Sequence, residues 1–172
     1  MEQANDKSIL DCIDNLTIVV RDCDLSQEII SKYKKGMILK EPVFCEANYV
    51  LGGFPCNARF AIFSNRFKEF STIDKVKGIC FTDMISRFKV LDIIKGENKT
   101  EIVLLHLPND ERWKNFRDLT YIVEQRIVQI AKRNFDTLVL AEPVSELSTK
   151  EILSKFSRPL GMDENMNFVD ID

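Results

Sequence analysis

The sequence contains few of the residues that most often mark a catalytic or metal-binding protein. Its 172 residues include one histidine and one tryptophan, and its five cysteines form no Cys-x-x-Cys pair. Any imidazole chemistry must therefore use His106. An odd number of cysteines leaves one unpaired in a complete disulfide scheme, so we expect buried, reduced thiols and a cytoplasmic location. We expect no metal centre and no cofactor.

Long apolar runs and a surplus of basic residues are also absent. No uninterrupted apolar stretch approaches the ~20 residues that cross a bilayer, so we expect no membrane association. The net charge of -3 and the pI near 5.4 argue against a dedicated nucleic-acid binder. A composition of 45% hydrophobic and 30% charged residues is typical of a soluble globular protein. We expect one domain over residues 1–172, with flexible ends at 1–8 and 163–172, and the oligomeric state stays open.

The hydrophobic period changes within one continuous stretch in the second half of the chain. Phe88–Ile94 has the pattern of a strand, Lys95–Lys99 supplies turn residues, and Thr100–Leu107 has the pattern of a second, more buried strand. Apolar residues then recur at a spacing near 3.6 over Arg112–Arg133. This pattern predicts a hairpin followed by one long amphipathic helix over about 110–134.

Shorter elements are expected on either side. Leu16–Val20 is a β-branched run that predicts a strand, and Ser26–Lys35 predicts a short helix that ends at a glycine. Val43–Leu51 and Asn57–Ser64 predict two strands joined by a glycine-rich turn, and a capping box opens a final helix over 148–157.

Strands connected by hairpins, followed by a helix-rich end, are typical of the α+β class. We therefore predict a mainly antiparallel sheet of four to six strands. One long amphipathic helix and two shorter helices are expected to pack against it.

One pair of carboxylates offers an enzymatic interpretation. An apolar strand that leads into Asp22-x-Asp24 resembles the first motif of haloacid-dehalogenase-like phosphohydrolases. That resemblance implies a magnesium ion, with Asp22 as the nucleophile and Asp24 as the general acid and base. Arg21 and the Leu25-Ser26 pair depart from the motif. Asp24 is equally explained as the cap of the following helix.

His106 offers a second enzymatic interpretation. As a general base it could activate Cys56, Cys80 or Ser64, with an acidic residue orienting the imidazole ring. No local nucleophile motif surrounds these residues. A histidine within an apolar strand is more often a structural side chain with a hydrogen bond to a neighbouring group.

The remaining candidates are residues that could contact a partner. Phe54 lies at the tip of the glycine-rich turn, and Trp113 lies beside Arg112 and Arg117 at the expected helix start. Tryptophan and arginine are enriched at the centres of protein interfaces. With no complete catalytic motif, the sequence favours a small cytoplasmic, non-enzymatic protein. We expect it to act by protein–protein binding, as an adaptor, regulatory subunit or inhibitor.

Overall fold

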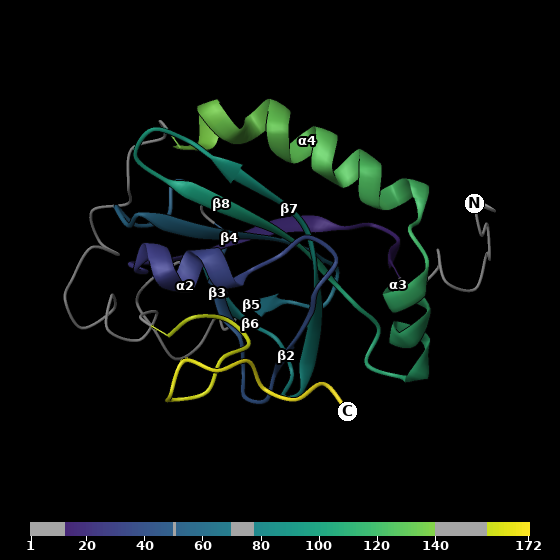
Figure 1. Ribbon diagram of the computed structural model, residues 1–172. Helices are drawn as coiled ribbons and strands as arrows, with labels where there is room; N and C mark the ends of the chain where they lie inside the picture. The colour runs from purple at the N-terminus through teal and green to yellow at the C-terminus, as the bar shows by residue number, and fades with distance from the viewer. Residues whose placement is uncertain (1–12, 50, 70–77, 140–157) are drawn as a thin grey trace.

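The centre of the molecule is one eight-stranded sheet in the order β2-β7-β8-β4-β1-β3-β6-β5. The computed structural model describes residues 13–49, 51–69, 78–139 and 158–172 (Figure 1). Within these residues every neighbouring pair of strands is antiparallel except β4 and β8, which are parallel. The strands are β1 (Thr17–Cys23), β2 (Ile38–Glu41), β3 (Glu46–Asn48), β4 (Ala58–Ser64), β5 (Lys68–Glu69), β6 (Ile79–Phe81), β7 (Ser86–Lys95) and β8 (Thr100–His106).

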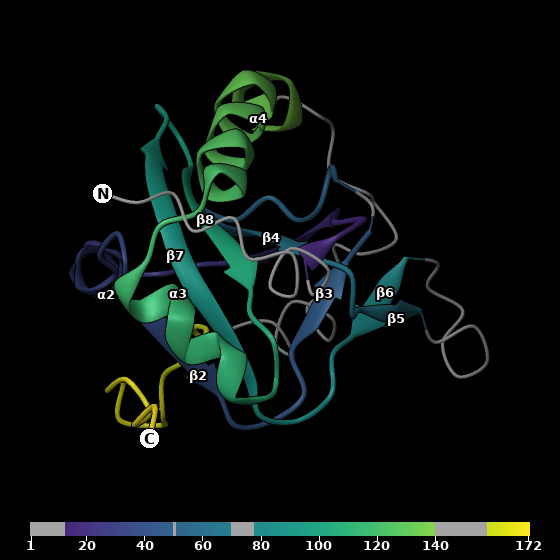
Figure 2. The same cartoon turned by 90° about the vertical axis from the view of Figure 1, so that its right-hand side faces the viewer.

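Helices cover both faces of this sheet. They are α2 (Gln27–Lys32), the 3-10 turn η2 (Glu111–Lys114), α3 (Asn115–Asp118) and α4 (Ile122–Val139). Figure 1 shows α4 running along the β7 and β8 hairpin, and Figure 2 shows β5 and β6 projecting at the opposite end of the sheet. Every residue of β4 and β8 is buried, which explains why their hydrophobic runs hardly alternate.

Two hydrophobic clusters lie on the two faces. The first joins α2 and the C-terminal residues to one face of the sheet, with Tyr33, Phe60, Leu104 and Met162 among its members. The second joins η2, α3 and α4 to the other face through residues such as Trp113. Side chains alternate between the two faces along each strand. The sheet therefore forms the middle layer of a three-layer molecule.

The predicted fold class is wrong. The sheet has eight strands instead of four to six, it is mixed because β4 and β8 run parallel, and no single long helix spans 110–134. The strands predicted over 43–51 and 57–64 do not pair with each other. Both β3 and β4 pair with β1, which lies between them. A local pattern indicates that a segment is extended, but it does not identify the neighbouring strand.

The long helix predicted over about 110–134 is interrupted. Leu119 has an extended backbone (φ -115°, ψ 148°), so α3 ends before it and α4 begins at Ile122. Nζ of Lys89 donates to the carbonyl of Leu119 at 3.1 Å, and Oε1 of Glu124 accepts from the backbone N–H of Tyr121 at 3.2 Å. These two side chains satisfy backbone groups at the interruption, which allows the chain to change direction there.

The other predictions concern the two short helices, the membrane and the domain organisation. The short helix predicted over 26–35 is confirmed as α2, although Ser26 rather than Asp24 caps it. The final helix predicted over 148–157 lies outside the described residues. Among the described residues, no helix combines the length and apolar composition needed to cross a membrane. The single domain and the flexible ends stay predictions, as does the cytoplasmic location.

Candidate functional site

The main candidate site is a pocket between α2 and the end of β7. Its volume is about 530 Å³, within the range of small-molecule sites. The lining residues come from α2, the turn after it and β7: Gln27, Ile30, Ser31, Tyr33, Lys34, Lys35, Ile93 and Lys95. We call this the lysine pocket.

The floor and the rim of the lysine pocket differ in polarity. Ile30 and Tyr33 are buried and contribute apolar surface, whereas Lys34, Lys35 and Lys95 are exposed. No acidic residue lines the pocket among the residues that the structure describes. Asp92, which precedes Ile93 on β7, has its own partner, because its Oδ2 lies 2.8 Å from Nζ of Lys132. The pocket therefore combines an apolar floor with a cationic rim.

Local structure brings these residues together. The Ser26 hydroxyl accepts the N–H of Ile29 and starts α2, and Gly36 (φ +87°) turns the chain after it. The N–H of Gly36 then donates to the carbonyl of Val90 on β7 at 2.8 Å. The sequence gives no local sign of this pocket, because Lys95 lies some sixty residues further along the chain than Lys34 and Lys35.

Asp22 belongs to a buried cluster of charges on the opposite face of the sheet from α2. Its Oδ1 lies 2.8 Å from Nε of Arg59 and 2.8 Å from Nζ of Lys99, and its Oδ2 accepts the N–H of Phe54 at 3.0 Å. Asp24 instead accepts the N–H of Asn57 at 3.0 Å. The phosphohydrolase interpretation is wrong, because both oxygens of Asp22 are already occupied by cationic or backbone donors.

Glu101 stands next to that cluster. Register places Asp22, Arg59 and Glu101 opposite one another on β1, β4 and β8. Glu101 is 1% exposed, and burial raises its pKa to about 7. Its Oε2 has no hydrogen-bond partner among the described residues. Sequence reasoning missed this carboxyl, because within β8 it looks like an ordinary polar residue at a strand end.

His106 contacts a hydroxyl group, as one of the sequence hypotheses required. Its Nδ1 lies 2.8 Å from Oγ of Ser64, and the backbone N–H of Arg66 donates to the same Oγ at 3.0 Å. A serine Oγ has one proton and two lone pairs, so beside the N–H of Arg66 it can donate to Nδ1 or accept from it, according to the tautomer of the ring. Either direction holds the imidazole against Ser64.

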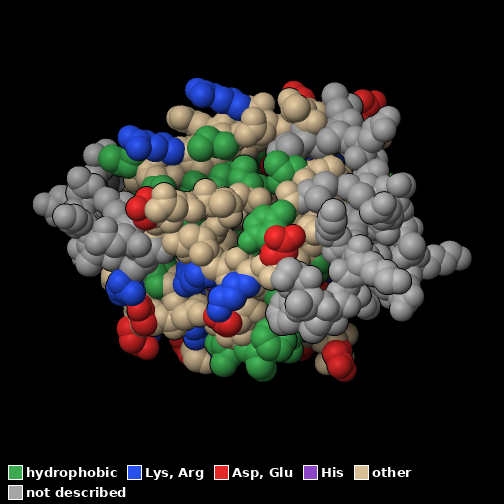
Figure 3. Space-filling view, turned by 180° about the vertical axis from the view of Figure 1, so that it is seen from behind, with side chains coloured by type: hydrophobic (Ala, Val, Ile, Leu, Met, Phe, Trp, Pro, Cys, Tyr) green, Lys and Arg blue, Asp and Glu red, His purple; other side chains and the backbone are tan. Residues whose placement is uncertain are grey.

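The surroundings of His106 do not suit catalysis. The imidazole is 1% exposed and lies against the rings of Phe88 and Phe67, with centroids 4.7 and 6.0 Å away. Figure 3 shows no histidine on the face that it presents. Burial holds the pKa of His106 well below 6.5, and burial also raises the pKa of the Cys56 thiol to about 11. The Cys/His hydrolase hypothesis is wrong, because the imidazole is enclosed by aromatic rings and the thiols are poor nucleophiles.

The residues predicted to bind a partner lie in different environments. Phe54 and Trp113 are 1% and 3% exposed, so their side chains belong to the interior. The guanidinium carbons of Arg87 and Arg117 lie 4.7 and 4.9 Å from the Trp113 ring centroid. Arg112 pairs with Asp110 at the surface. A binding role for Phe54, Trp113, Arg112 and Arg117 stays a prediction.

Comparison with known proteins finds similarity only at the level of structure. No protein family matches the sequence, and no curated protein does. The ADP-ribosyltransferase HopU1 of Pseudomonas syringae pv. Tomato DC3000 is similar at 20% identity and a TM-score of 0.48, over 54% of this chain and 45% of that one. The type III effector XopAI of Xanthomonas axonopodis pv. citri is similar at 16% identity and a TM-score of 0.48, over 56% and 43%.

A third similar structure comes from another bacterium. The Vis toxin, an ADP-ribosyltransferase from Vibrio splendidus, has 15% identity and a TM-score of 0.43, over 54% of this chain and 49% of that one. The similar region therefore spans about half the length of these proteins. The comparison gives no support to the predicted non-enzymatic protein that acts by protein–protein binding, because the structures it finds are ADP-ribosyltransferases and a type III effector. At TM-scores below 0.5, the activity of the neighbours does not transfer to this chain.

Proposed function

We propose that this protein binds a phosphorylated small molecule of the nucleotide class in the lysine pocket. The observation that supports the proposal is the position of Lys34, Lys35 and Lys95 around an apolar floor. A nucleotide has the matching distribution of properties, with a flat, weakly polar base and charged phosphates.

The charge balance of the pocket favours a ligand with more than one negative charge. Three ammonium groups around one opening repel each other, and a polyphosphate relieves that repulsion. Charge-assisted hydrogen bonds to phosphate oxygens are among the stronger polar contacts in proteins. The rings and alkyl groups of Ile30, Tyr33 and Ile93 supply the apolar contact for a base.

Calorimetric titration with ADP-ribose, which has an adenine base and two phosphates, tests the proposal. We expect binding at low salt, weaker binding as salt increases, and a lower affinity for adenosine, which lacks phosphates. Lys35→Ala and Lys95→Ala should each weaken ADP-ribose binding about tenfold, the size of one lost charged hydrogen bond. Chromatography of the same mixtures shows whether the ligand is converted to product.

A matched control separates the pocket from general electrostatic attraction. Lys68 lies on β5, has a side chain 75% exposed and is not part of the lysine pocket. Lys68→Ala should therefore leave the affinity for ADP-ribose unchanged. Equal binding by the parent and by a Lys34→Ala, Lys35→Ala, Lys95→Ala triple variant would show that the ligand binds elsewhere or non-specifically, and the proposal would be wrong.

A further inference from the structure

The C-terminal segment, residues 158–172, lies against the same face of the sheet as α2 (Figure 1). It folds back on itself, because Met162 pairs with Phe168 and the N–H of Val169 donates to the carbonyl of Gly161 at 2.9 Å. Leu160 and Met162 are 1% and 0% exposed and pack into the first hydrophobic cluster. This segment therefore covers part of the sheet far from it in sequence.

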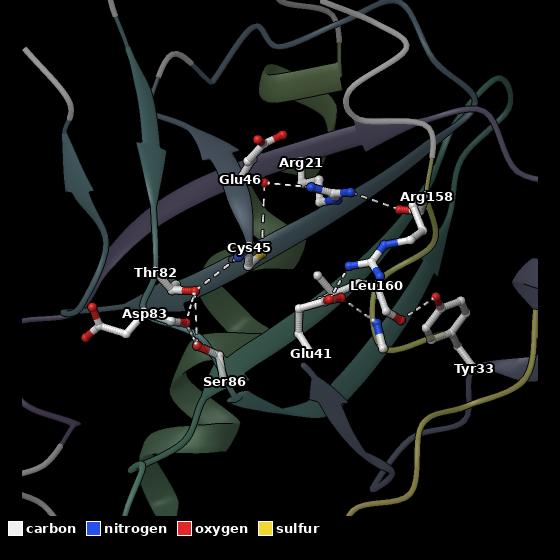
Figure 4. A network of polar contacts seen from close by, with 11 residues as sticks. Arg21, Tyr33, Glu41, Cys45, Glu46, Thr82, Asp83, Ser86, Arg158 and Leu160 are labelled. Carbon is white, nitrogen blue, oxygen red and sulfur yellow. Dashed lines mark hydrogen bonds and ion pairs between the residues drawn. The ribbon is translucent and has the colours of Figure 1, made fainter. Parts of the chain in front are cut away.

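Three buried side chains of the body bind the main chain of this segment (Figure 4). Nη2 of Arg21 on β1 donates to the carbonyl of Arg158 at 3.0 Å, and the hydroxyl of Tyr33 donates to the carbonyl of Leu160 at 2.8 Å. Oε2 of Glu41 on β2 accepts the N–H of Gly161 at 3.1 Å. Recognition of successive main-chain groups is how proteins hold an extended peptide.

Other contacts depend on the sequence of the segment. The carboxylate of Glu41 also pairs with the guanidinium of Arg158. Gly161 has φ +76°, and a Cβ added there would lie 2.9 Å from Cβ of Leu39. The position of Leu160 requires an apolar residue, because it packs in the core. The body thus favours arginine, an apolar residue and glycine at fixed positions.

The groups that bind the segment are held by the body itself. Nη1 of Arg21 donates to the carbonyl of Glu46 on β3 at 3.0 Å, which orients the guanidinium from within the sheet. Beyond Met162 the half-buried ring of Phe168 packs edge-on against Tyr33, with centroids 5.3 Å apart. The polar contacts there are exposed, such as Nζ of Lys32 with the carbonyl of Met166 at 3.1 Å and Arg117 with Asp172 at 3.3 Å. Exposed pairs of this kind contribute little. Attachment therefore depends on Arg158, on the buried residues from Leu160 to Met162 and on the ring of Phe168.

We propose that Arg21, Tyr33 and Glu41 form a groove for an extended peptide, which the chain's own C-terminal segment occupies. In this arrangement the segment is an intramolecular ligand that can leave the groove while the sheet stays folded. A peptide with the same arginine, apolar residue and glycine can then take its place. This inference does not depend on the function proposed for the lysine pocket.

Fluorescence anisotropy with a labelled synthetic peptide of residues 158–172 tests the groove in the full chain. In the parent protein the tethered segment competes at an effective concentration on the order of millimolar, so the added peptide should bind weakly. Arg158→Ala in the protein weakens only the tethered segment. We expect at least a tenfold increase in affinity for the unmodified peptide.

Two controls locate the binding. Adding Glu41→Gln to the Arg158→Ala protein changes the groove itself and should remove the gained affinity. A peptide with Gly161→Ala should also fail to bind, because its Cβ meets Leu39. Hydrogen exchange should show faster exchange at the amide of Gly161 in Arg158→Ala, with the amides of β4 and β8 still protected.

The alternative is that the segment is an inseparable part of the core. In that case the Arg158→Ala protein either unfolds, or stays folded and binds the peptide no more tightly than the parent. Either result overturns the proposal, and circular dichroism distinguishes them.

Discussion

Asp22 and Arg59 face each other from adjacent strands at positions where both side chains are 1% exposed, with Oδ1 2.8 Å from Nε. Lys99 adds a second cation at 2.8 Å from the same oxygen. A carboxylate so enclosed stabilises two buried cations and has no free oxygen for chemistry. The Asp22 side chain thus has a structural role near the end of β1.

Replacement of Asp22 should destabilise the protein strongly. Asp22→Ala leaves Arg59 and Lys99 buried without their shared carboxylate, which typically costs about 3–5 kcal/mol of unfolding free energy. Urea unfolding followed by circular dichroism measures this loss. As a control, Asp83→Ala removes an exposed pair with Lys68, at 3.9 Å, and should change the unfolding free energy by less than about 0.5 kcal/mol. Similar small effects for both variants would contradict the structural role of Asp22.

A second prediction concerns the loop that covers Asp22. Gly53 has φ +55°, and a Cβ there would lie 1.9 Å from Oδ2 of Asp22. Gly36 has φ +87° with nothing within 4 Å of the added Cβ. Gly36→Ala should therefore cost only the backbone strain, about 1–2 kcal/mol. Gly53→Ala should cost at least about 2 kcal/mol more, because the methyl group displaces the carboxylate.

Thermal and urea unfolding of the two glycine variants measure the difference. Equal destabilisation would mean that the loop moves away and that the close approach of Gly53 to Asp22 is not a constraint. Each variant serves as the other's control, because both replace a glycine of positive φ with alanine.

A third prediction concerns the pH dependence of stability. Burial raises the pKa of Glu101 from 4.5 to about 7, so the folded protein keeps this proton to a higher pH than the unfolded chain. The contribution of Glu101 is therefore favourable below pH 4.5 and is lost as the pH rises toward 7. The glutamine in Glu101→Gln does not titrate, so the variant does not lose stability in this way as the pH rises. The variant should gain stability over the parent across this window, by on the order of 3 kcal/mol above pH 7.

Urea unfolding of the parent and Glu101→Gln between pH 4 and pH 8 tests this expectation. The difference between the two proteins is the relevant quantity, because His106 titrates in both and cancels. A difference that stays constant with pH would show that Glu101 titrates normally in the folded state.

Local pattern predicted some elements well. The hairpin of β7 and β8 was expected from the strand, turn and strand over 88–107, and the two strands do pair as antiparallel neighbours. The short helix after Ser26 was predicted at nearly its observed position, although Ser26 instead of Asp24 caps it and it ends at Lys32, before Gly36. These elements depend on residues close together in the chain, and that is why their sequence signals are strong.

The candidate sites depended on contacts that no local pattern encodes. Lys95 meets Lys34 and Lys35 only because the end of α2 is bonded to β7. Likewise, the carboxylate of Asp22 lies beside Arg59 and Lys99 because β1 pairs with β4. The motif-based interpretation of Asp22 failed because a motif shows spacing and leaves out the cations that surround the carboxylate.

The amino-acid sequence by itself determined which segments are extended, which are helical and which side chains avoid water, because these properties follow from backbone preferences and hydrophobic period. Only the tertiary structure decided that β1 lies between β3 and β4 and that β8 runs parallel to β4. It also decided that the C-terminal segment binds Arg21, Tyr33 and Glu41. The physical reason is that burial and pairing of distant groups depend on the whole chain packing at once, and such pairings leave no periodic signal.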